Sequence, residues 1–546
     1  MVLEQTDFYK TSHYKMYPEG TTKIYSNFTP RKSRMKGVDK VVFFGLQYFI
    51  LEYLIKQWNE DFFGRREWHN GKRMRSHVLY KSSVIGKYKR LMNFTLGKDS
   101  VDTKHIEELY DLGYLPLEIK ALPEGTLCPI GVPCFTLTNT VDHAYWLVNY
   151  LETIISCTVW QPITSATIAY EYKKLLTKYA LETTGTDGFV QFQGHDFSMR
   201  GMSSLESACT SGAGHLLSFA GTDTILAISF LESYYGANIE KELVGTSVPA
   251  TEHSVMCMGS KDDEIGTFKR LLDIYPKGIL SVVSDTWDLW KVCTEFLPTL
   301  KEQILARDGK LVIRPDSGDP VDIICGQELV VDKVVDGMEA GVNYKQNPHE
   351  PSRKGVVELL WDTFGGTTNK YGYKELDPHI GAIYGDSITL ERAKAICERL
   401  KAKGFASTNI VFGIGSYTYQ YNTRDTFGFA MKATYGEVEM SGYPEGSSPE
   451  ALEPHQWTEA REIFKAPITD SGEKKSAKGL LAVHQRVHLK DLQTEAMWAG
   501  SPELYLKQQC TKEQEEVGLL QTVFLNGKLT KFQTLSEIRN RLNEQK

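Results

Sequence analysis

Four short apolar runs in the second half of the chain each stop abruptly at polar residues or glycine. They lie at 279–285, 310–318, 380–386 and 409–415. Segments with helical periodicity follow several of them, as at 287–306 and 388–403. A buried strand, a polar turn and a helix form the repeating unit of a parallel sheet or barrel. We therefore predict an α/β barrel, with its reactive groups gathered where the carboxyl ends of the strands meet.

The flanking regions have a different pattern, in which strand-like runs are separated by Pro and Gly turns. Such runs lie at 23–28, 115–125, 133–138 and around Asn526-Gly527, and helical periodicity marks 44–58, 142–158 and 162–183. Two polar or turn-rich regions, 65–105 and 436–480, show little period, and we expect them to run over the surface.

The chain is thus predicted to have three parts. These are an N-terminal α+β segment (1–160, with an insertion at about 65–105), an α/β barrel domain (161–435), and a C-terminal segment (436–546) that returns to the N-terminal domain.

Composition narrows the class of protein. The 546 residues carry a formal net charge of -7, whereas proteins that bind nucleic acids generally have a basic surface. No apolar run approaches the roughly 20 residues that span a bilayer, and the N-terminus lacks a signal-peptide pattern. The nine cysteines form no CxxC pairs, which favours reduced thiols. We expect a cytoplasmic protein without a structural zinc site and with neither nucleic acid nor membrane as a partner.

The motif Arg314-Pro-Asp316 closes one of the apolar runs. Residues two apart on a strand project to the same side, so both side chains can face one site. Arginine offers a planar fork to a phosphate or carbonyl group, and aspartate can orient a hydroxyl or a metal-bound water. An ion pair that closes a βα turn would have the same sequence, so the motif alone leaves both interpretations open.

A second motif places Phe197 and Arg200 just before a helical run at 205–219. Backbone N–H groups at a helix start favour anions, and a ring followed three residues later by arginine suits a stacking site. Phe197 would also suit an ordinary core position. Asp223 follows a glycine turn, where it is either a ligand acceptor or a helix cap.

The remaining candidates are weaker when taken one at a time. The turns Gly385-Asp386 and Gly413–Ser416 could hold phosphate through backbone amides, although such turns are common. His253 is a candidate nucleophile or general acid/base, and equally a structural histidine. Further positive charge comes from Arg424, Lys432, Lys465 and Lys474, residue types that usually lie on a solvated surface.

Taken in order, these segments closely resemble the nicotinamide phosphoribosyltransferases. The segments that carry the resemblance are 6–18 (TDFYKTSHYKMYP), 44–48 (FGLQY), 115–125, 195–201 (HDFSMRG), 221–224 (GTDT), 248–254 (VPATEHS), 281–285 (SVVSD), 313–318 (IRPDSG), 385–386, 412–415 (FGIG), 423–425 and 522–530 (TVFLNGKLT). The resemblance extends in order from the start nearly to the C-terminus.

The resemblance implies the fold of type II phosphoribosyltransferases, an incomplete α/β barrel with an additional mixed, β-rich domain built from the N- and C-terminal segments. It implies a homodimer with shared active sites that joins nicotinamide to phosphoribosyl pyrophosphate, giving nicotinamide mononucleotide and pyrophosphate. ATP hydrolysis would be coupled through a phosphohistidine at His253. Mg²⁺ would be held mainly by the substrate pyrophosphate, and its protein ligands are left unassigned.

The resemblance also implies roles for single residues. Phe197 and, from the other chain, Tyr9 would sandwich the pyridine ring, with Asp223 and Arg314 at the carboxamide. Phosphates would be held by Arg200, Gly385, Gly415, Ser416, Arg424 and Lys432 and, from the other chain, by Arg31, Lys465 and Lys474. Asp316 and Asp386 would bind ribose hydroxyls or orient the reactants, supported by Asp285. Ser416 stands where the family usually has glycine.

The nearest competing interpretation is a nicotinate phosphoribosyltransferase, which shares the fold and the Thr-Asp-x-Tyr opening. The block at 195–200 and Asp223 favour the amide substrate, because a carboxylate ligand would face a like charge. At about 4 Å and an effective dielectric near 20, this repulsion is roughly 4 kcal/mol. Two more distant interpretations are a catalytically silent binding protein on the same scaffold and an unrelated barrel that binds sugar phosphates.

Overall fold

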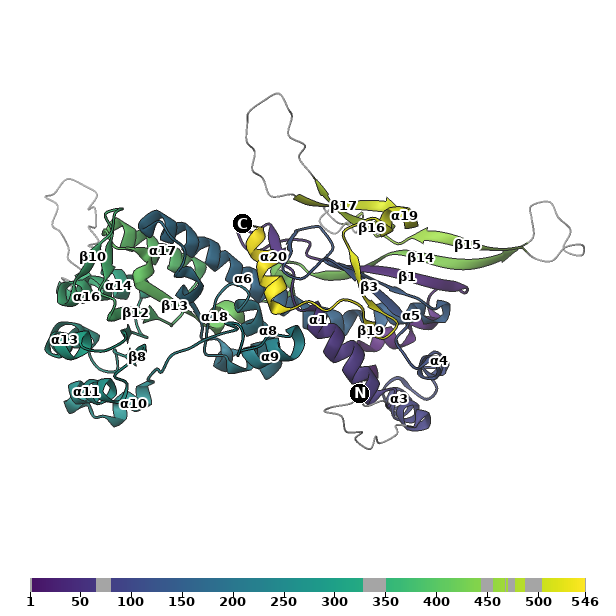
Figure 1. Cartoon of the computed structure of the whole chain (residues 1–546). Coiled ribbons are helices and arrows are strands. Elements are labelled where there is room, and N and C mark those ends of the chain that lie inside the picture. The colour runs from purple at the N-terminus through teal and green to yellow at the C-terminus, as the bar shows by residue number, and fades with distance from the viewer. Residues whose placement is uncertain are drawn as a thin grey trace, which may run out of the picture. The chain divides into compact units, whose positions relative to one another are not determined.

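The computed structural model describes residues 2–64, 80–327, 350–442, 455–466, 468–469, 477–486 and 503–545. Lys474 and part of each low-period region lie outside these residues. The chain divides into two units (Figure 1). The first, Met1–Thr167 with Leu231–Ala237 and Thr423–Lys546, is called the antiparallel unit, and the second, Ile168–Phe230 with Asn238–Asn422, the parallel unit.

The parallel unit is built on a six-stranded sheet of order β7-β6-β13-β12-β9-β8, in which every pair is parallel. Its strands are β6 (Gly194–Asp196), β7 (Gly221–Thr222), β8 (Leu280–Val283), β9 (Leu311–Arg314), β12 (Ile380–Tyr384) and β13 (Ile410–Ile414). Segment 246–250 bridges both edges, through Thr246 to Gly221 and Ala250 to Ser281. The predicted incomplete α/β barrel is confirmed.

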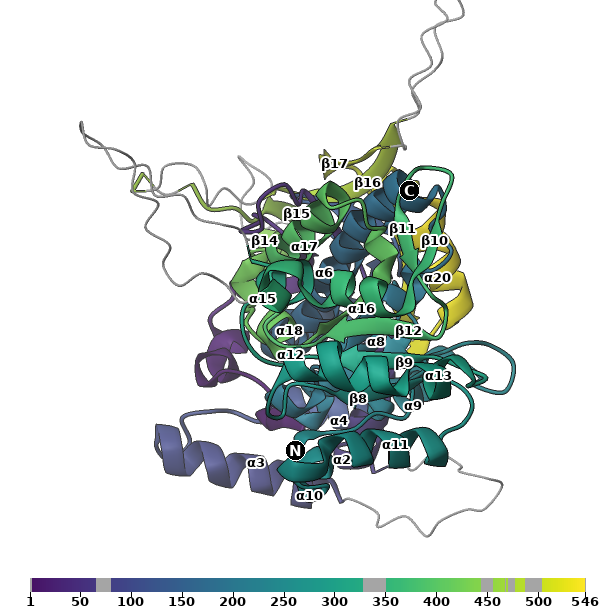
Figure 2. The same cartoon turned by 90° about the vertical axis from the view of Figure 1, so that its left-hand side faces the viewer.

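Helices α13, α16 and α17 lie around strands β8, β9 and β12 (Figures 1 and 2). Every residue of β8 and of β12 is buried, as expected for strands covered on both faces. The helices of this unit include α7 (Val190–Gln193), η5 (Met199–Gly201), α8 (Leu205–His215), α10 (His253–Met258), η6 (Lys261–Asp263), α11 (Glu264–Ile274), α12 (Leu289–Lys291), η7 (Val292–Phe296), α13 (Leu297–Leu305), α14 (Pro320–Cys325), α15 (Glu350–Lys354), α16 (Val356–Phe364), α17 (Leu390–Ala402), η8 (Ser407–Asn409) and α18 (Ser416–Tyr419). It also contains the start of α9 (Ile225–Tyr235), whose residues from Leu231 are assigned to the antiparallel unit, and a hairpin of β10 (Gly366–Thr368) and β11 (Lys374–Leu376).

The antiparallel unit interleaves the two ends of the chain in one seven-stranded sheet of order β15-β14-β1-β5-β3-β18-β19. Its strands are β1 (Thr21–Thr29), β3 (Leu117–Ala121), β5 (Phe135–Asn139), β14 (Ala430–Gly442), β15 (His455–Glu462), β18 (Gln521–Leu525) and β19 (Lys528–Leu529). Strand β1 pairs with β5 on one side and with β14 on the other, so the expected sheet of N- and C-terminal strands is confirmed.

Shorter elements complete this unit. They are η1 (Val2–Glu4), η2 (Phe8–Lys15), β2 (Lys40–Val42), β4 (Leu127–Pro129), α1 (Leu46–Phe49), η3 (Ile50–Gln57), α2 (Trp58–Asp61), α3 (Lys81–Leu96), α4 (Lys104–Leu112), η4 (Asp142–Ala144), α5 (Tyr145–Tyr150), η9 (Arg424–Thr426), β16 (Leu480–Arg486), β17 (Glu503–Cys510), α19 (Lys512–Glu516) and α20 (Leu535–Glu544), together with the start of α6 (Glu152–Thr184).

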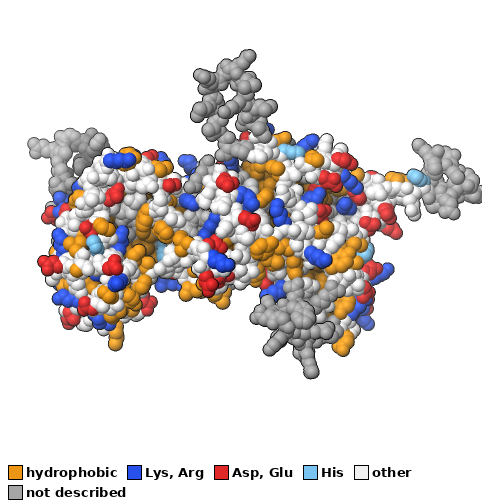
Figure 3. Space-filling model, in the orientation of Figure 1, with side chains coloured by type: hydrophobic (Ala, Val, Ile, Leu, Met, Phe, Trp, Pro, Cys, Tyr) orange, Lys and Arg blue, Asp and Glu red, His pale blue; other side chains and the backbone are white. Residues whose placement is uncertain are grey.

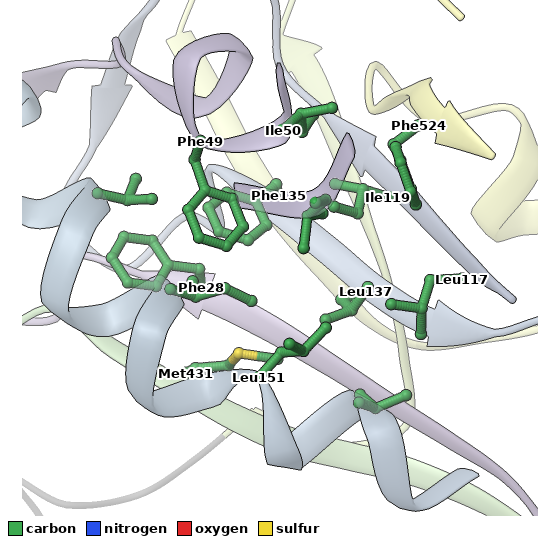
Figure 4. Close-up of a cluster of buried hydrophobic side chains, with 14 of the residues drawn as sticks. Phe28, Phe49, Ile50, Leu117, Ile119, Phe135, Leu137, Leu151, Met431 and Phe524 are labelled. Carbon is green, nitrogen blue, oxygen red and sulfur yellow. The ribbon is translucent and has the colours of Figure 1, made fainter. Parts of the chain in front are cut away.

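The core of the antiparallel unit combines aliphatic side chains with phenylalanine rings, among them Phe28 and Phe135 (Figure 4). The ring of Phe28 lies 5.0 Å from that of Phe135 and 5.4 Å from that of Phe429, nearly parallel to both. All three are fully buried and come from strands or turns far apart in sequence. Aromatic burial therefore joins the N-terminal strands to the residues that follow the barrel.

Two sequence expectations about elements were wrong, and a third was wrong only at a boundary. The segments 142–158 and 162–183 are helical as predicted, but they form η4, α5 and then one unbroken α6, which keeps Pro162 inside it. Residues 81–96 form helix α3, which buries Val84, Ile85, Tyr88 and Met92 rather than running over the surface. Residues 436–442 and 455–462 belong to the paired strands β14 and β15. Buried positions alternate with less buried ones from Thr434 to Val438 of β14, whereas no residue of β15 is buried, so polar side chains masked both strands in the sequence.

Among the described residues, no helix is both long and apolar enough to cross a membrane. On the face shown in Figure 3, acidic and basic side chains are interspersed over both units, in keeping with the small net charge.

Candidate active site

The parallel sheet brings the candidate site residues that follow or end its six strands to one edge. Phe197 follows β6, Asp223 follows β7, Asp285 follows β8, Arg314 ends β9 and Asp386 follows β12, while Gly415 and Ser416 follow β13. Carboxyl ends of parallel strands meet at the same edge, so residues far apart in sequence converge there.

Phe197, Asp223 and Arg314 line one cavity of about 380 Å³. Most other walls are apolar and include Val248, Val312 and Ile383. The guanidinium carbon of Arg314 lies 5.7 Å from the centre of the Phe197 ring. The cavity therefore combines an aromatic face, an anion and a cation in apolar surroundings, which suits a flat polar ring.

Two glycines make room for the Phe197 ring. A Cβ atom on Gly385 would stand 2.7 Å from Cδ2 of that ring, and one on Gly413 would collide with the same atom. The ring is half-buried and lines the cavity, so it is not an ordinary core side chain.

Asp223 receives two hydrogen bonds on one carboxylate oxygen. His195 Nε2 donates to Oδ1 at 2.9 Å and Ser247 Oγ donates to the same atom at 2.7 Å. Burial opposes ionisation of this carboxyl group, but the hydrogen bonds from His195 and Ser247, with the positive charge of Arg314, outweigh it and lower its pKa. Asp223 is therefore an ionised acceptor at the cavity wall rather than a helix cap.

A larger, charged pocket of about 1100 Å³ adjoins this cavity. The two share Phe197, Asp223, Ala250 and Arg314, which stand at their junction. The charged pocket is also lined by Arg200, Asp316, Gly385, Asp386, Gly415 and Ser416. An apolar slot that opens into a polar pocket suits a ligand with a flat ring at one end and a phosphorylated sugar at the other.

Asp285 ties two βα turns together. Its Oδ2 accepts hydrogen bonds from the backbone N–H of Asp316 at 2.8 Å and from Ser317 Oγ at 2.6 Å. Among the described residues, Asp285 Oδ1 and Arg314 Nε have no hydrogen-bond partner although both atoms are buried. Buried polar atoms without partners beside a pocket are free to bind a ligand.

Asp316 lies between positive groups and other acids. Its Oδ2 is 3.8 Å from a guanidinium nitrogen of Arg314 and 3.9 Å from Nε2 of His253. Burial raises the pKa of Asp316; Arg314 opposes the rise, and the nearby charges of Asp285 and Asp386 add to it. Arg314 and Asp316 thus interact with each other and also face the charged pocket.

His253 is the first residue of α10, and about half of its side chain is exposed. Its Nδ1 is 3.3 Å from Thr286 Oγ1, and its Nε2 points toward Asp316. His253 is therefore an exposed imidazole beside Asp316, a residue that lines the charged pocket.

Sequence relatives show the family to which this chain belongs. The chain is 49% identical to a nicotinamide phosphoribosyltransferase of Acinetobacter baylyi, over 100% of this chain and 97% of that protein. It is 30% identical to the protein of the same name from Xanthomonas campestris, over 98% of this chain and 97% of the relative. The chain belongs to the nicotinamide phosphoribosyltransferase family. The family model for the nicotinamide phosphoribosyltransferase N-terminal domain matches residues 1–60, and that of the nicotinate phosphoribosyltransferase (NAPRTase) family matches 192–444.

The fold of this nicotinamide phosphoribosyltransferase family member is also found in a solved structure. A nicotinate-nucleotide pyrophosphorylase from Pyrococcus furiosus superposes with a TM-score of 0.52 at 13% identity, covering 100% of this chain and 95% of that one. At that identity the likeness concerns the fold alone.

The departure from the nicotinamide phosphoribosyltransferase pattern at Ser416 is accommodated locally. A Cβ atom on Gly201 would collide with the Ser416 side chain, so the serine occupies space that Gly201 leaves open. The turn after β13 therefore carries a hydroxyl group into the charged pocket without displacing the segment that bears Arg200.

Several expected site residues lie in the antiparallel unit. Arg31, Lys432 and Lys465 line a pocket of about 750 Å³ there. Tyr9 lies on η2 with 61% of its surface exposed, and Arg424 begins η9. The sequence assigned Arg31 and Lys432 to different chains, whereas the structure groups them in one pocket of the same chain.

Two residues of the site were missed by the sequence analysis, His195 and Ser247. His195 could have been found, because it alternates with the buried Asp196 on β6 and so faces the same side as Phe197. The sequence around Ser247 has no comparable strand pattern, because Ser247 and Asp223 both lie in loops. Among the described residues, no group of three or more His, Cys, Asp or Glu side chains is arranged to hold a metal ion.

Proposed function

We propose that this chain transfers the 5-phosphoribosyl group of phosphoribosyl pyrophosphate to the pyridine nitrogen of nicotinamide, giving nicotinamide mononucleotide and pyrophosphate. It is a pentosyltransferase of NAD salvage. The observation that carries the proposal is the junction of the apolar cavity and the charged pocket at Phe197, Asp223 and Arg314. The names of the full-length relatives support it.

In this proposal the cavity binds the amide. The pyridine ring stacks on Phe197, Asp223 accepts a hydrogen bond from the carboxamide N–H, and Arg314 donates to the carboxamide oxygen. The lowered pKa of Asp223 keeps this residue anionic, so nicotinate would meet a like charge at the same place. Discrimination against the acid thus follows from the charge of one side chain.

The charged pocket holds the phosphoribosyl group. Asp316 and Asp386 bind ribose hydroxyls or orient the reactants, and Asp285 supports them through the turn that it holds. Arg200 and the turns at Gly385, Gly415 and Ser416 take the phosphates.

A second copy of the chain, in a homodimer with shared sites, supplies Tyr9 to the ring and Arg31, Lys465 and Lys474 to the phosphates. Since Lys432 shares the pocket of Arg31, it comes from that same copy. Arg424 completes the cationic set.

The reaction needs alignment and charge stabilisation rather than proton transfer. The lone pair of the pyridine nitrogen forms the bond to C1 of the ribose, and the C1–O bond breaks with its electron pair leaving on pyrophosphate. The nucleophile is neutral and carries no proton on the attacking nitrogen. The arginines and lysines stabilise the departing negative charge.

Mg²⁺ fits this donor set as a metal held mainly by the substrate. Magnesium usually binds one or two protein carboxylates together with substrate phosphates and water, and Asp316 and Asp386 both face the charged pocket. When bound, it neutralises charge on the pyrophosphate.

ATP is the proposed coupled co-substrate. An imidazole nitrogen of His253 would attack the γ-phosphorus, ADP would leave, and water would later hydrolyse the phosphohistidine. The exposure of His253 and its position 3.9 Å from Asp316 support this role. For the location of the chain we propose the cytoplasm, which suits nine cysteines that are all free thiols.

The test is an assay with phosphoribosyl pyrophosphate, Mg²⁺ and either nicotinamide or nicotinate, with and without ATP. We expect rapid product formation with nicotinamide, a kcat/KM about a thousandfold lower with nicotinate, loss of activity with chelator, and stimulation by ATP that His253→Ala abolishes. Asp223→Asn should reduce the preference for the amide. Equal use of both pyridines would instead favour a nicotinate phosphoribosyltransferase, and no pyrophosphate release with either would indicate a binding protein.

A further inference from the structure

Both protein donors to Asp223 act on the same oxygen atom. His195 approaches Oδ1 from β6, and Ser247 approaches it from segment 246–250, which bridges the two edges of the barrel. Among the described residues, Oδ2 receives no hydrogen bond. A carboxylate that is held by two donors on one oxygen presents the other oxygen in a fixed direction.

Segment 246–250 is itself fixed in position beside Asp223. The backbone N–H of Thr246 donates to Ala220 O at 2.7 Å, and Thr246 O accepts from the N–H of Thr222 at 2.9 Å. At the other end, the N–H of Thr251 donates to Ser281 O at 3.0 Å. Because backbone bonds anchor both ends, the Ser247 hydroxyl group is held where it can reach the carboxylate.

We propose that Ser247 is a specificity-determining positioning residue, whose hydroxyl group, with His195, fixes Asp223 so that Oδ2 is presented to the cavity as an ionised acceptor for a carboxamide N–H. This inference rests on the proposed function and deepens it. Ser247 acts through Asp223 and takes no part in bond formation.

The electrostatics around Asp223 give the inference a measurable consequence. The charged groups with the largest effect on it are His195 on β6 and Arg314 on β9, and Ser247 is the neutral donor. Lys310 also lines the cavity. Without the serine hydroxyl group, burial is opposed by fewer interactions, so the pKa of Asp223 rises. A protonated Asp223 no longer repels nicotinate and no longer attracts the amide N–H. Amide preference should therefore be lost at a higher pH than in the unmodified enzyme.

The experiment compares Ser247→Ala, Ser247→Thr and Ser247→Cys with the unmodified full-length enzyme. The kcat/KM values for nicotinamide and nicotinate are measured across the acid limb of the pH profile. We expect Ser247→Ala to reduce the amide-to-acid ratio on the order of tenfold, mostly through the KM for nicotinamide, and to move the acid limb to higher pH. Ser247→Thr keeps the hydroxyl group and should retain the amide-to-acid ratio and the acid limb of the unmodified enzyme. Ser247→Cys, a weaker donor, should give values between those of Ser247→Ala and Ser247→Thr.

Thr246→Ala is the matched control. It alters the neighbouring cavity residue, whose side chain contacts Ser247 O rather than Asp223, so the position of the acid limb should not move. If the unmodified enzyme prefers the amide and Ser247→Ala keeps both the ratio and the acid limb, the inference is wrong and the proposed function stands. If the unmodified enzyme does not distinguish the two pyridines, the proposed function fails instead. Should Ser247→Ala not fold, the comparison of Ser247→Cys with Ser247→Thr decides the question by the same criteria.

Discussion

At the scale of single residues, the cavity depends on side chains that are absent as much as on those present. Gly385 and Gly413 are positions where a methyl group would meet the Phe197 ring, and Gly201 is where it would meet Ser416. Gly385 follows β12 and Gly413 lies within β13, whereas Gly201 ends η5. The shape of the cavity therefore depends partly on glycines, which have no side chain to fill the space that Phe197 occupies.

Gly413→Ala should push the Phe197 ring out of its present position. Because the ring is the proposed stacking surface, we expect the KM for nicotinamide to rise on the order of tenfold or more, with a smaller effect on the KM for phosphoribosyl pyrophosphate. Steady-state kinetics with each substrate varied in turn measure the two effects.

Gly86→Ala is the control for this change, since a Cβ atom there meets nothing within 4 Å on helix α3. It should leave both KM values unchanged. An unaltered KM for nicotinamide in Gly413→Ala would show that the ring does not stack on the substrate.

At the scale of elements, a buried histidine joins the turn after β13 to strand β7. His215 ends α8, its Nε2–H donates to Gly221 O at 3.0 Å, and Tyr419 on α18 donates its O–H to Nδ1 at 2.7 Å. Both side chains are fully buried. The contact links the backbone that precedes Asp223 to the helix that begins at Ser416.

Burial lowers the pKa of His215 to about 4, with a smaller opposing effect from Asp196 and a further lowering by His195. The unfolded chain binds a proton at this residue near pH 6.5, whereas the folded chain does not until about pH 4. Stability should therefore fall as the pH drops from about 6.5 to 4, by roughly 3 kcal/mol from this group.

The measurement is urea unfolding at several pH values for the unmodified protein and for His215→Gln. The variant should be less stable near neutral pH and should lose less stability on acidification. Parallel pH dependences in the two proteins would contradict a neutral buried histidine.

Many of the strands and helices, and several site residues, were predictable from the sequence, and the exceptions have physical causes. The parallel sheet followed from apolar runs that end in polar turns, and helices α12 to α13 and α17 lie where periodicity predicted them. The periodicity predicted two helical segments at 142–158 and 162–183, whereas α6 continues through 159–161 with Pro162 inside it, because tertiary packing overrides local preference. Phe197, Asp223 and Arg314 were predictable as candidates, but the contact between Ser247 and Asp223 depends on a loop position that no local pattern encodes.

At the scale of the whole molecule, the proposed homodimer makes a quantitative prediction. Tyr9→Ala and Asp223→Asn should each remove most of the activity toward nicotinamide when present in every chain. In a mixed dimer, one site combines an unmodified Asp223 with an unmodified Tyr9 from the other chain. Random assortment of equal amounts should therefore restore about a quarter of the original activity.

The two variants would be refolded together and assayed beside each one refolded alone. Mixing Asp223→Asn with Arg314→Ala serves as the control. Both residues lie in the same unit of one chain, so each site of a mixed dimer would contain one of the two substitutions. No recovery in the first mixture would show that Tyr9 acts within its own chain.

The position of β1 in the middle of its sheet has a consequence for biosynthesis. Asn27 and its β14 partner Lys432 are 405 residues apart, so one edge of β1 stays unpaired until most of the polypeptide has left the ribosome. At roughly 5–20 residues per second, that edge waits on the order of half a minute or more. During this time an exposed strand edge can recruit another nascent chain, so production of this protein depends on chaperones that cover it or on translation that outpaces such encounters.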